Sequence, residues 1–486
     1  MTAPPLFRLL ALVLLALAVF GAGVWYGKAS EVTPAEARET GPDWAERRPA
    51  TPRYEPRELS DGARMFVELI RNQQSETIHA IGEAWQPSHL PYAVEALHML
   101  GGHLEARYEF ERLLAEKTGT EIELGDVNAW YRLIWASGVE PEPDYADYKA
   151  EVYRWLDHRF HEYFAKDKTS LINLAEVRWG GVYRDGIPPL RQPKMVDAEL
   201  AGSYLADSDV VFGIEVNGDA RAYPKRILAW HEMFVDEVGG LPVAGVYCTL
   251  CGTVILYETD HEGVQHELGT SGFLYRSNKL MYDKATKSLW STLRGTPVIG
   301  PLADSQPPIV LPRRAVVTTT WGEWKTRHPD TQVLSIRTGH NRDYSEGAAY
   351  RDYFATDELM FAVPESDTRL DNKREVLALT FPEAGDETLA IDTDLLNQNP
   401  VYHGALGPIG FVVLTDPTGA NRVYDADGRS FVRYDGTGTV TDDRGQTWSV
   451  SEDALERPGE RLDRLPAQRA FWFGWRAAFP DVRLIH

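Results

Sequence analysis

The 486-residue chain contains only two cysteines, Cys248 and Cys251, and they stand in the motif Tyr-Cys-Thr-Leu-Cys-Gly-Thr. Apolar, β-prone runs lie on both sides of them, at residues 241–247 and 253–257, which predicts a tight turn between two strands. Two thiols on one turn are close enough to form a disulfide or to hold one metal ion. Because the chain uses cysteine nowhere else, we expect both thiols to belong to one site.

The residues around the pair leave three interpretations open. A redox dithiol is the first, although the residues after Cys251 do not form the helix N-terminus that lowers the thiol pKa in thioredoxin-type sites. A copper or zinc carrier is the second. Since only two thiolates exist, His231, or His261 and His266 downstream, would have to complete its ligand set. An inert disulfide that clips a hairpin in a structural or adaptor protein is the third.

Both active interpretations need a group near the sulfurs, and His231 is the nearest polar candidate upstream in the sequence. Its imidazolium would lower a thiol pKa in a redox site. Its neutral ring would be the third ligand, beside Cys248 and Cys251, in a metal site. We therefore expect a ring nitrogen of His231 within about 4 Å of a sulfur. The alternative is a histidine at a helix start that bonds the backbone.

Further polar residues are candidates for binding a substrate, namely Ser271, Tyr282, His340 and Arg342. The loop at residues 338–343 follows an apolar run and suits the presentation of an imidazole and a guanidinium to an anion or a thiolate. A hydrogen-bonded turn is the alternative for this loop. The chain has neither a nucleophile elbow around Ser271 nor a glycine-rich phosphate loop, which argues against a serine hydrolase and against nucleotide binding.

Residues 9–26 are uncharged and mostly apolar, and Arg8 and Lys28 flank them. This pattern predicts a signal peptide or a single membrane anchor that places the folded part in the periplasm or outside the cell. In such an oxidising compartment we expect the cysteine pair to rest as a disulfide. The sequence leaves open whether the apolar segment is cleaved.

The chain carries 50 basic and 72 acidic residues, which gives a net charge of −22. Because this charge repels phosphate backbones, nucleic acid is excluded as a partner. We expect an α+β fold in five segments. These are a signal or anchor at 1–28, a flexible linker at 29–58, an α-helical domain at 59–170 that offers a surface for a protein partner, and β-rich repeats at 171–375 and 376–486.

The two β-rich segments resemble each other, which predicts an internal duplication. Residues 240–257 are similar to residues 406–424, and a later segment with tryptophans and a Pro-Asp pair is repeated as well. In this alignment Leu414 and Pro417 stand where the first copy has its two cysteines. We therefore expect the chemistry to be confined to the first copy and the shared tryptophans to belong to the core.

The order of several short motifs resembles that of a known family. The motifs are Trp-His-Glu (230–232), Tyr-Cys-x-x-Cys-Gly-Thr (247–253), Thr-Ser-Gly-x-Leu (270–274), Ser-Leu-Trp-Ser (288–291), His-Pro-Asp-Thr-x-Val-Leu-Ser (328–335) and Thr-Gly-His-x-Arg-Asp-Tyr (338–344). With them, residues 175–486 resemble domain of unknown function 3179, an uncharacterised family of exported bacterial and archaeal proteins. Relatives carry selenocysteine in the Cys-x-x-Cys motif, so the resemblance implies redox reactivity. Thiol redox chemistry on an unknown substrate is our leading expectation.

Overall fold

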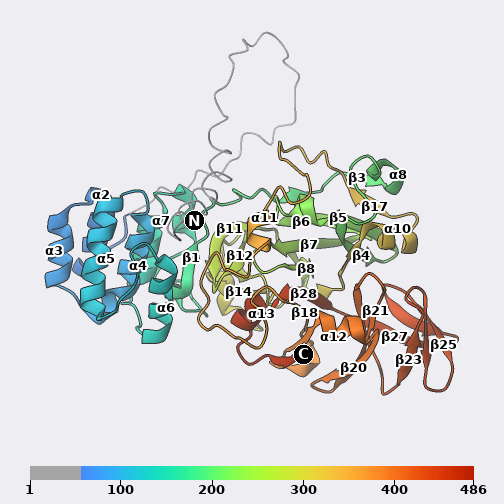
Figure 1. The fold of residues 1–486 in the computed structure, drawn as a ribbon. Helices are drawn as coiled ribbons and strands as arrows, with labels where there is room; N and C mark the ends of the chain where they lie inside the picture. The colour runs from blue at the N-terminus through green and yellow to red at the C-terminus, as the bar shows by residue number, and fades with distance from the viewer. Residues whose placement is uncertain (1–55) are drawn as a thin grey trace, which may run out of the picture. The chain divides into compact units, whose positions relative to one another are not determined.

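The computed structural model describes residues 56–486. The expected signal or anchor at 1–28, and nearly all of the expected linker at 29–58, lie outside the described residues. Within the described part, no helix is both long and apolar enough to span a membrane. A helical region comes first and a larger β-rich region follows, in the order that the sequence predicts (Figure 1).

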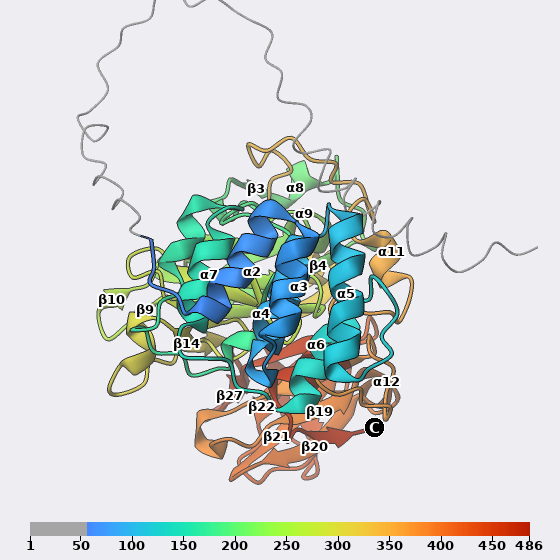
Figure 2. The same ribbon diagram turned by 90° about the vertical axis from the view of Figure 1, so that its left-hand side faces the viewer.

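Apolar residues at helical spacing form the N-terminal helical region. In its first helix Phe66, Leu69 and Ile70 are buried, and the Ser60 hydroxyl caps the helix by accepting the N–H of Ala63 at 3.1 Å. The α-helices are α2 (Asp61–Asn72), α3 (Ser75–Glu83), α4 (Leu90–Met99), α5 (Leu104–Thr118), α6 (Val127–Ser137) and α7 (Tyr145–Tyr153). Figure 2 shows most of them as a layer in front of the strands.

The helical region shares a core with a five-stranded sheet of order β1-β11-β12-β13-β14. The Tyr153 ring packs edge-on against the Phe273 ring, with their centroids 4.9 Å apart. The buried Lys149 ammonium pairs with Glu95 and donates to the carbonyl oxygen of Val177 at 2.6 Å. The strands are β1 (Val177–Trp179), β11 (Leu268–Tyr275), β12 (Asn278–Asp283), β13 (Leu289–Ser291) and β14 (Thr296–Ile299).

Two more sheets belong to the segment that carries the cysteines, with orders β16-β4-β5-β17-β3 and β15-β8-β7-β6-β2. In the second sheet β7 and β8 pair antiparallel as far as Cys248 and Thr253, which confirms the predicted strand-turn-strand unit. The elements are β2 (Leu190–Arg191), β3 (Met195–Asp197), α8 (Ala198–Ala201), β4 (Val210–Val216), β5 (Asp219–Pro224), α9 (Lys225–Leu228), β6 (Met233–Val238), β7 (Leu241–Cys248), β8 (Thr253–Glu258), β9 (Asp260–His261), β10 (Val264–Gln265), β15 (Arg313–Arg314), β16 (Val317–Thr320), α10 (Trp321–Arg327) and β17 (Gln332–Leu334).

The C-terminal segment repeats part of this strand arrangement. Its four-stranded sheet has the order β28-β18-β19-β29, which corresponds strand by strand to β16-β4-β5-β17. In both sheets the first three strands are antiparallel neighbours and the fourth runs parallel to the third. An eight-stranded sheet of order β20-β21-β22-β27-β26-β25-β24-β23 accompanies it. The elements are β18 (Glu375–Leu379), β19 (Leu389–Asp392), α12 (Thr393–Gln398), β20 (Val401–Leu406), β21 (Ile409–Thr415), β22 (Asn421–Asp425), β23 (Phe431–Tyr434), β24 (Thr439–Asp442), β25 (Thr447–Val450), β26 (Ala454–Arg457), β27 (Glu460–Leu465), β28 (Ala467–Phe471), α13 (Trp472–Ala478) and β29 (Arg483–Ile485).

Corresponding backbone hydrogen bonds align the β6–β7 hairpin with the β20–β21 hairpin. The N–H of Tyr247 donates to the carbonyl oxygen of Glu232 at 2.9 Å, just before β6. The N–H of Thr415 donates to the carbonyl oxygen of Pro400 at 2.9 Å, just before β20. Both hairpins also turn through two residues, between Val238 and Leu241 in one case and between Leu406 and Ile409 in the other. The two hairpins therefore have the same register.

This register corrects the sequence alignment around the cysteines. Asp416 follows the aligned hydrogen bond directly, as Cys248 does, so Asp416 occupies the position that corresponds to Cys248. The expectation that Leu414 takes this position is wrong by two residues. Because side chains alternate between the faces of a strand, a slip of two residues preserves the apolar pattern and is invisible in the sequence.

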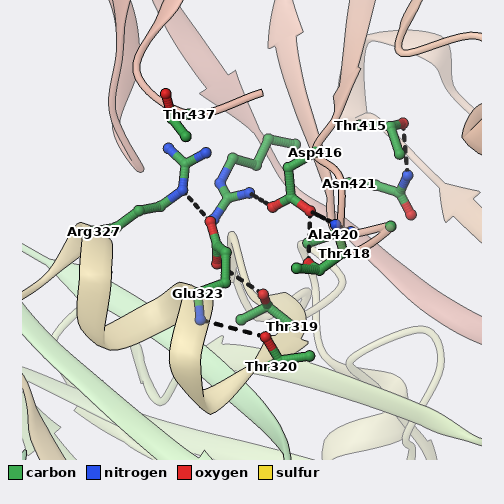
Figure 3. Close-up of polar contacts among 12 residues, drawn as sticks. Thr319, Thr320, Glu323, Arg327, Thr415, Asp416, Thr418, Ala420, Asn421 and Thr437 are labelled. Carbon is green, nitrogen blue, oxygen red and sulfur yellow. Dashed lines mark hydrogen bonds and ion pairs between the residues drawn. The ribbon is translucent and has the colours of Figure 1, made fainter. Parts of the chain in front are cut away.

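A buried ion network lies around Asp416 in the C-terminal hairpin. The Arg422 guanidinium donates to Asp416 at 2.9 Å, to Glu452 at 2.6 Å and to Glu323 of α10 at 3.2 Å. Figure 3 shows Asp416 and Glu323 approaching from different elements, with Arg327 bonded to Glu323 on the far side. The network thus connects the C-terminal hairpin with the segment that carries the cysteines.

The helices α10 and α13 each begin at a tryptophan and carry a second one three residues later. The second ring packs against the ring that follows the helix, with centroids 4.1 Å apart for Trp324 and His328 and 4.3 Å apart for Trp475 and Phe479. Both tryptophans are fully buried. The shared tryptophans therefore lie in the core, as expected.

Candidate functional site

The cysteine turn joins β7 to β8 and is buried. Cys248 is 2% exposed and Cys251 is 0% exposed, and both are free thiols, so the expected disulfide is not formed in this structure. The turn closes at Gly252, whose φ of +60° favours glycine. A Cβ atom at Gly252 would lie 2.8 Å from the ring of Phe471, so β28 packs directly against the turn.

The Cys251 thiol has a fixed acceptor on β12. Its Sγ lies 3.0 Å from Oδ1 of Asn278. The amide nitrogen of Asn278 donates to the carbonyl oxygens of Arg276 at 3.1 Å and of Gly474 at 3.3 Å, so the amide oxygen is the atom that faces the thiol. Gly474 also lets α13 approach, because a Cβ atom there would lie 3.0 Å from Cβ of Cys251.

The two thiols differ in acidity. Burial raises the pKa of Cys251 well above its ordinary value, and the neighbouring Cys248 raises it further. Burial acts on Cys248 as well, but the neighbouring Cys251 side chain and then the backbone N–H of Lys279 lower its pKa. Cys248 is therefore the more acidic thiol of the pair and Cys251 the less acidic one.

A buried ion pair lies beside the turn. The Lys279 ammonium is 3.1 Å from Oε2 of Glu232 and donates to the Glu232 carbonyl oxygen at 3.2 Å. Oε1 of Glu232 accepts the hydroxyls of Thr249 at 2.7 Å and Tyr350 at 3.3 Å. Thr249 follows Cys248 directly, so this carboxylate is hydrogen-bonded to the cysteine turn itself. Its negative charge raises the pKa of both thiols, which at Cys248 opposes the effects of Cys251 and Lys279.

The expected contact between His231 and a sulfur is not present. Its Nδ1 donates to the Pro188 carbonyl oxygen at 2.9 Å, and its Nε2 accepts the Tyr344 hydroxyl at 2.6 Å. Burial, and then the charges of His340 and Arg342, lower the pKa of His231 to about 4 although the bond to Pro188 raises it. A neutral ring with both nitrogens bonded elsewhere neither stabilises the thiolate nor completes a metal site.

The backbone explains why the next residue reaches the turn and His231 does not. Glu232 has a φ of +54°, in the left-handed region, so the chain bends sharply between the end of α9 and β6. The bend directs the Glu232 carboxylate toward Thr249 and leaves the His231 ring against Pro188. Among the described residues, no three His, Cys, Asp or Glu side chains gather to hold a metal ion, so the ligand set that we expected for copper or zinc is not assembled.

Two of the expected substrate-binding residues have structural contacts. The Ser271 hydroxyl donates to the carbonyl oxygen of Leu280 at 2.6 Å and accepts the N–H of Phe273 at 3.0 Å, which holds the irregular stretch of β11. The Tyr282 hydroxyl donates to Asp185 at 2.6 Å. Both contacts support the β11–β12 pair that carries the acceptor of the Cys251 thiol.

The other two, His340 and Arg342, lie in an exposed loop. The His340 ring is 5.0 Å from the His231 ring, and the Arg342 guanidinium lies 5.9 Å from the centre of the Trp230 ring. Within residues 56–486, neither side chain is hydrogen-bonded to a sulfur. The ring contacts of these two side chains are with His231 and Trp230 and not with the cysteine turn.

Sequence reasoning missed the residues that bond the cysteine turn from β12 and from the segment after β17. These are Asn278, Lys279, Tyr350 and Tyr353. One available signal was the Asn-Lys pair that opens an otherwise apolar strand. Another was the aromatic spacing of the two tyrosines inside a polar stretch.

No curated protein and no solved structure shows significant similarity to the chain. Residues 184–482 match the family described as protein of unknown function (DUF3179), and this match includes the cysteine turn, Glu232 and Lys279. Since the match covers more than half of the residues, the chain belongs to that family.

Proposed function

We propose that this protein is a thiol redox protein in which Cys248 attacks a disulfide and Cys251 resolves the product. The observation that carries the proposal is the asymmetry of the pair. The neighbouring Cys251 side chain and the backbone N–H of Lys279 lower the pKa of Cys248, whereas burial raises the pKa of Cys251, whose thiol donates to Oδ1 of Asn278 at 3.0 Å. This division between a nucleophile and a proton-bearing resolving thiol is what disulfide exchange requires.

The exchange balances without further groups. The Cys248 thiolate attacks one sulfur of a substrate disulfide, and the other substrate sulfur leaves as a thiolate. Cys251 gives its proton to that leaving thiolate and then attacks the Cys248 sulfur of the mixed disulfide. A Cys248–Cys251 bond forms, the second substrate sulfur leaves, and the substrate has gained the two electrons that the pair has lost. A dithiol reductant returns the pair to its starting state by the reverse exchange.

The proposed function includes a compartment and an internal duplication. We propose that residues 9–26 export or anchor the chain, which exposes the pair to oxidised substrates. The equal strand orders and the aligned hydrogen bonds support a duplication in which only the first copy has cysteines. A copper or zinc carrier has less support, because both ring nitrogens of His231 are hydrogen-bonded, to Pro188 and to Tyr344.

The test uses the reduced full-length chain and a chromogenic aryl disulfide. The wild type should release two aryl thiolates per chain and end with an internal disulfide. Cys251→Ser should release one and keep the aryl group on Cys248, and Cys248→Ser should react far more slowly. Equal rates for the two serine variants, or an aryl group retained by the wild type, would contradict the assignment.

A further inference from the structure

The cysteine pair is covered by a segment that has little secondary structure of its own. Residues 335–374 connect β17 to β18, and all of them are described. They contain no strand and a single short helix, α11 (Arg351–Phe354). Loops of this length inside a packed unit are uncommon, and many of them are active-site lids. Here the segment passes over the cysteines, so its contacts decide whether a reagent reaches them.

Aromatic rings from this segment close the site. Tyr353 is buried in the same apolar cluster as both cysteines, Leu250 and Leu274, and the rings that pack against this cluster are those of Tyr350, Phe354 and Phe361. Figure 1 shows α11 in orange beside β11 and β12, which agrees with these contacts. With the segment in this position Cys248 is only 2% exposed, so a substrate sulfur cannot approach it.

Three tyrosine hydroxyls attach the segment to the residues around the turn. Tyr344 donates to His231 at 2.6 Å, and Tyr350 donates to Glu232 at 3.3 Å. Tyr353 donates at 2.9 Å to the carbonyl oxygen of Leu250, which lies between the two cysteines. Consecutive residues, His231 and Glu232, thus receive two of the three bonds, and the turn itself receives the third.

The attachment is held in a strained conformation. Tyr350 has a φ of +60° and its acceptor Glu232 has a φ of +54°, and neither residue is a glycine. Side chains with a Cβ atom adopt this region only where surrounding contacts impose it. The hydroxyl bond between these two residues is one of those contacts. The Tyr350–Glu232 bond therefore joins two residues whose backbone conformation the surrounding structure imposes.

The far end of the segment is attached independently of the cysteines. The N–H of Ala362 donates to Asn128 of α6 at 3.1 Å, and the Asn128 amide donates to the carbonyl oxygen of Met360 at 3.2 Å. Lys373 donates to the carbonyl oxygens of Tyr353 and, at 2.7 Å, of Thr356. Residues 337–343 at the other end are mostly exposed. The bonds to Tyr353, Thr356 and Met360 also hold the segment in its closed position, so opening breaks them together with the tyrosine hydroxyl bonds.

We propose that residues 344–361 form a cover that closes over Cys248 and Cys251 and must open before a substrate disulfide reacts. The proposal rests on the proposed function, and it adds that access, rather than thiol chemistry alone, sets the rate. The three tyrosine hydroxyls are the latch. Opening leaves Glu232 and the carbonyl oxygen of Leu250 free to accept hydrogen bonds from an incoming substrate.

Alkylation of the reduced full-length chain by iodoacetamide tests the cover without any redox step. Because the chain has only two cysteines, every adduct reports on this pair. We expect slow alkylation of Cys248 in the wild type and a rate about fivefold higher in Tyr350→Phe and in Tyr353→Phe, since each variant loses one latch bond. Tyr344→Phe, at the start of the cover, should show the same direction.

The matched control is Tyr424→Phe. Tyr424 also donates a buried hydroxyl to a backbone carbonyl, that of Ser451 at 2.7 Å, but it lies in the C-terminal sheet. The cysteines of this variant should be alkylated at the wild-type rate. In the wild type, low urea should accelerate alkylation only weakly, because local opening exposes little surface. Fast alkylation of the wild type, equal acceleration in Tyr424→Phe, or a urea dependence equal to that of global unfolding would overturn the cover. Aryl disulfide stoichiometry decides the redox function separately.

Discussion

Replacing Arg422 by methionine should destabilise the protein strongly, and more at neutral than at acidic pH. The guanidinium is 1% exposed and bonds three carboxylates, those of Asp416, Glu452 and Glu323. Figure 3 shows Asp416 and Glu323. Methionine keeps much of the side-chain length but removes the charge, which leaves one carboxylate charge in excess beside Arg464 and Arg327. Removal of one partner from a buried ion network costs about 3–5 kcal/mol of unfolding free energy.

The pH dependence follows from the carboxylates. Burial alone would raise the pKa of Glu452, but Arg422 and then Arg464 lower it well below its ordinary value. The pKa of Asp416 is lowered as well. Lowered pKa values in the folded state give stability that is present above the unfolded pKa and is lost as the pH falls. Without Arg422 one cause that lowers both pKa values is lost, so these carboxyls bind protons more tightly in the folded variant than in the folded wild type. The difference between wild type and variant should therefore shrink below about pH 4.5.

Denaturation in guanidinium chloride at neutral pH and at pH 4, followed by tryptophan fluorescence, measures this difference. Arg461→Met is the matched control, because Arg461 is about half exposed and pairs with Glu456 at 2.6 Å and Asp463 at 2.8 Å on the surface. Its loss should be below about 1 kcal/mol. A similar small loss for Arg422→Met, or a loss that does not change with pH, would refute the reasoning.

Two further predictions concern the turn and the buried histidines. Gly252→Ala should cost about 2–3 kcal/mol, because φ is +60° and the added Cβ overlaps the Phe471 ring, whereas Gly263→Ala, at φ +80° with open space around it, should cost only about 1 kcal/mol in the same denaturation assay. The pKa of His231 falls from 6.5 to about 4 and that of His98 to about 3. Both histidines thus bind a proton less readily in the folded state than in the unfolded chain. The free energy of unfolding should therefore fall as the pH drops from 6.5 toward 4. The contribution of His231 is up to about 3 kcal/mol, and His231→Asn should lose this part of the slope.

The cysteine turn could be predicted because its determinants are local. A motif of seven residues, with apolar runs on both sides, specifies two strands and a turn whatever packs around them. The helical region was predictable for the same reason, since buried residues such as Phe66, Leu69 and Ile70 repeat at helical spacing. In both cases neighbours in the sequence supply the signal.

The surroundings of the thiols could not be predicted because they come from distant segments. Asn278 and Lys279 stand about thirty residues after the cysteines, and Tyr350 and Tyr353 about a hundred residues after them. Only the pairing of β11 with β12 and the path of the connection to β18 bring them to the turn. His231 was misjudged because proximity in sequence does not set direction. The left-handed backbone of Glu232 directs the Glu232 side chain, and not that of His231, toward the cysteine turn.

A comparison of the two hairpins bears on why the cysteines are present. The hairpin that contains Asp416 has the same strand order and the same backbone hydrogen bond as the hairpin that contains Cys248, and it has no thiol. This architecture therefore does not require cysteine for its own stability. Each hairpin keeps a buried ion pair near its turn, but the acid is Glu232 beside the cysteines and Asp416 in the other. If the two cysteines served only to hold a turn, an ion network would serve equally, as the network around Arg422 does. Because packing alone does not account for the two buried thiols, this comparison supports the proposal that Cys248 and Cys251 take part in a reaction.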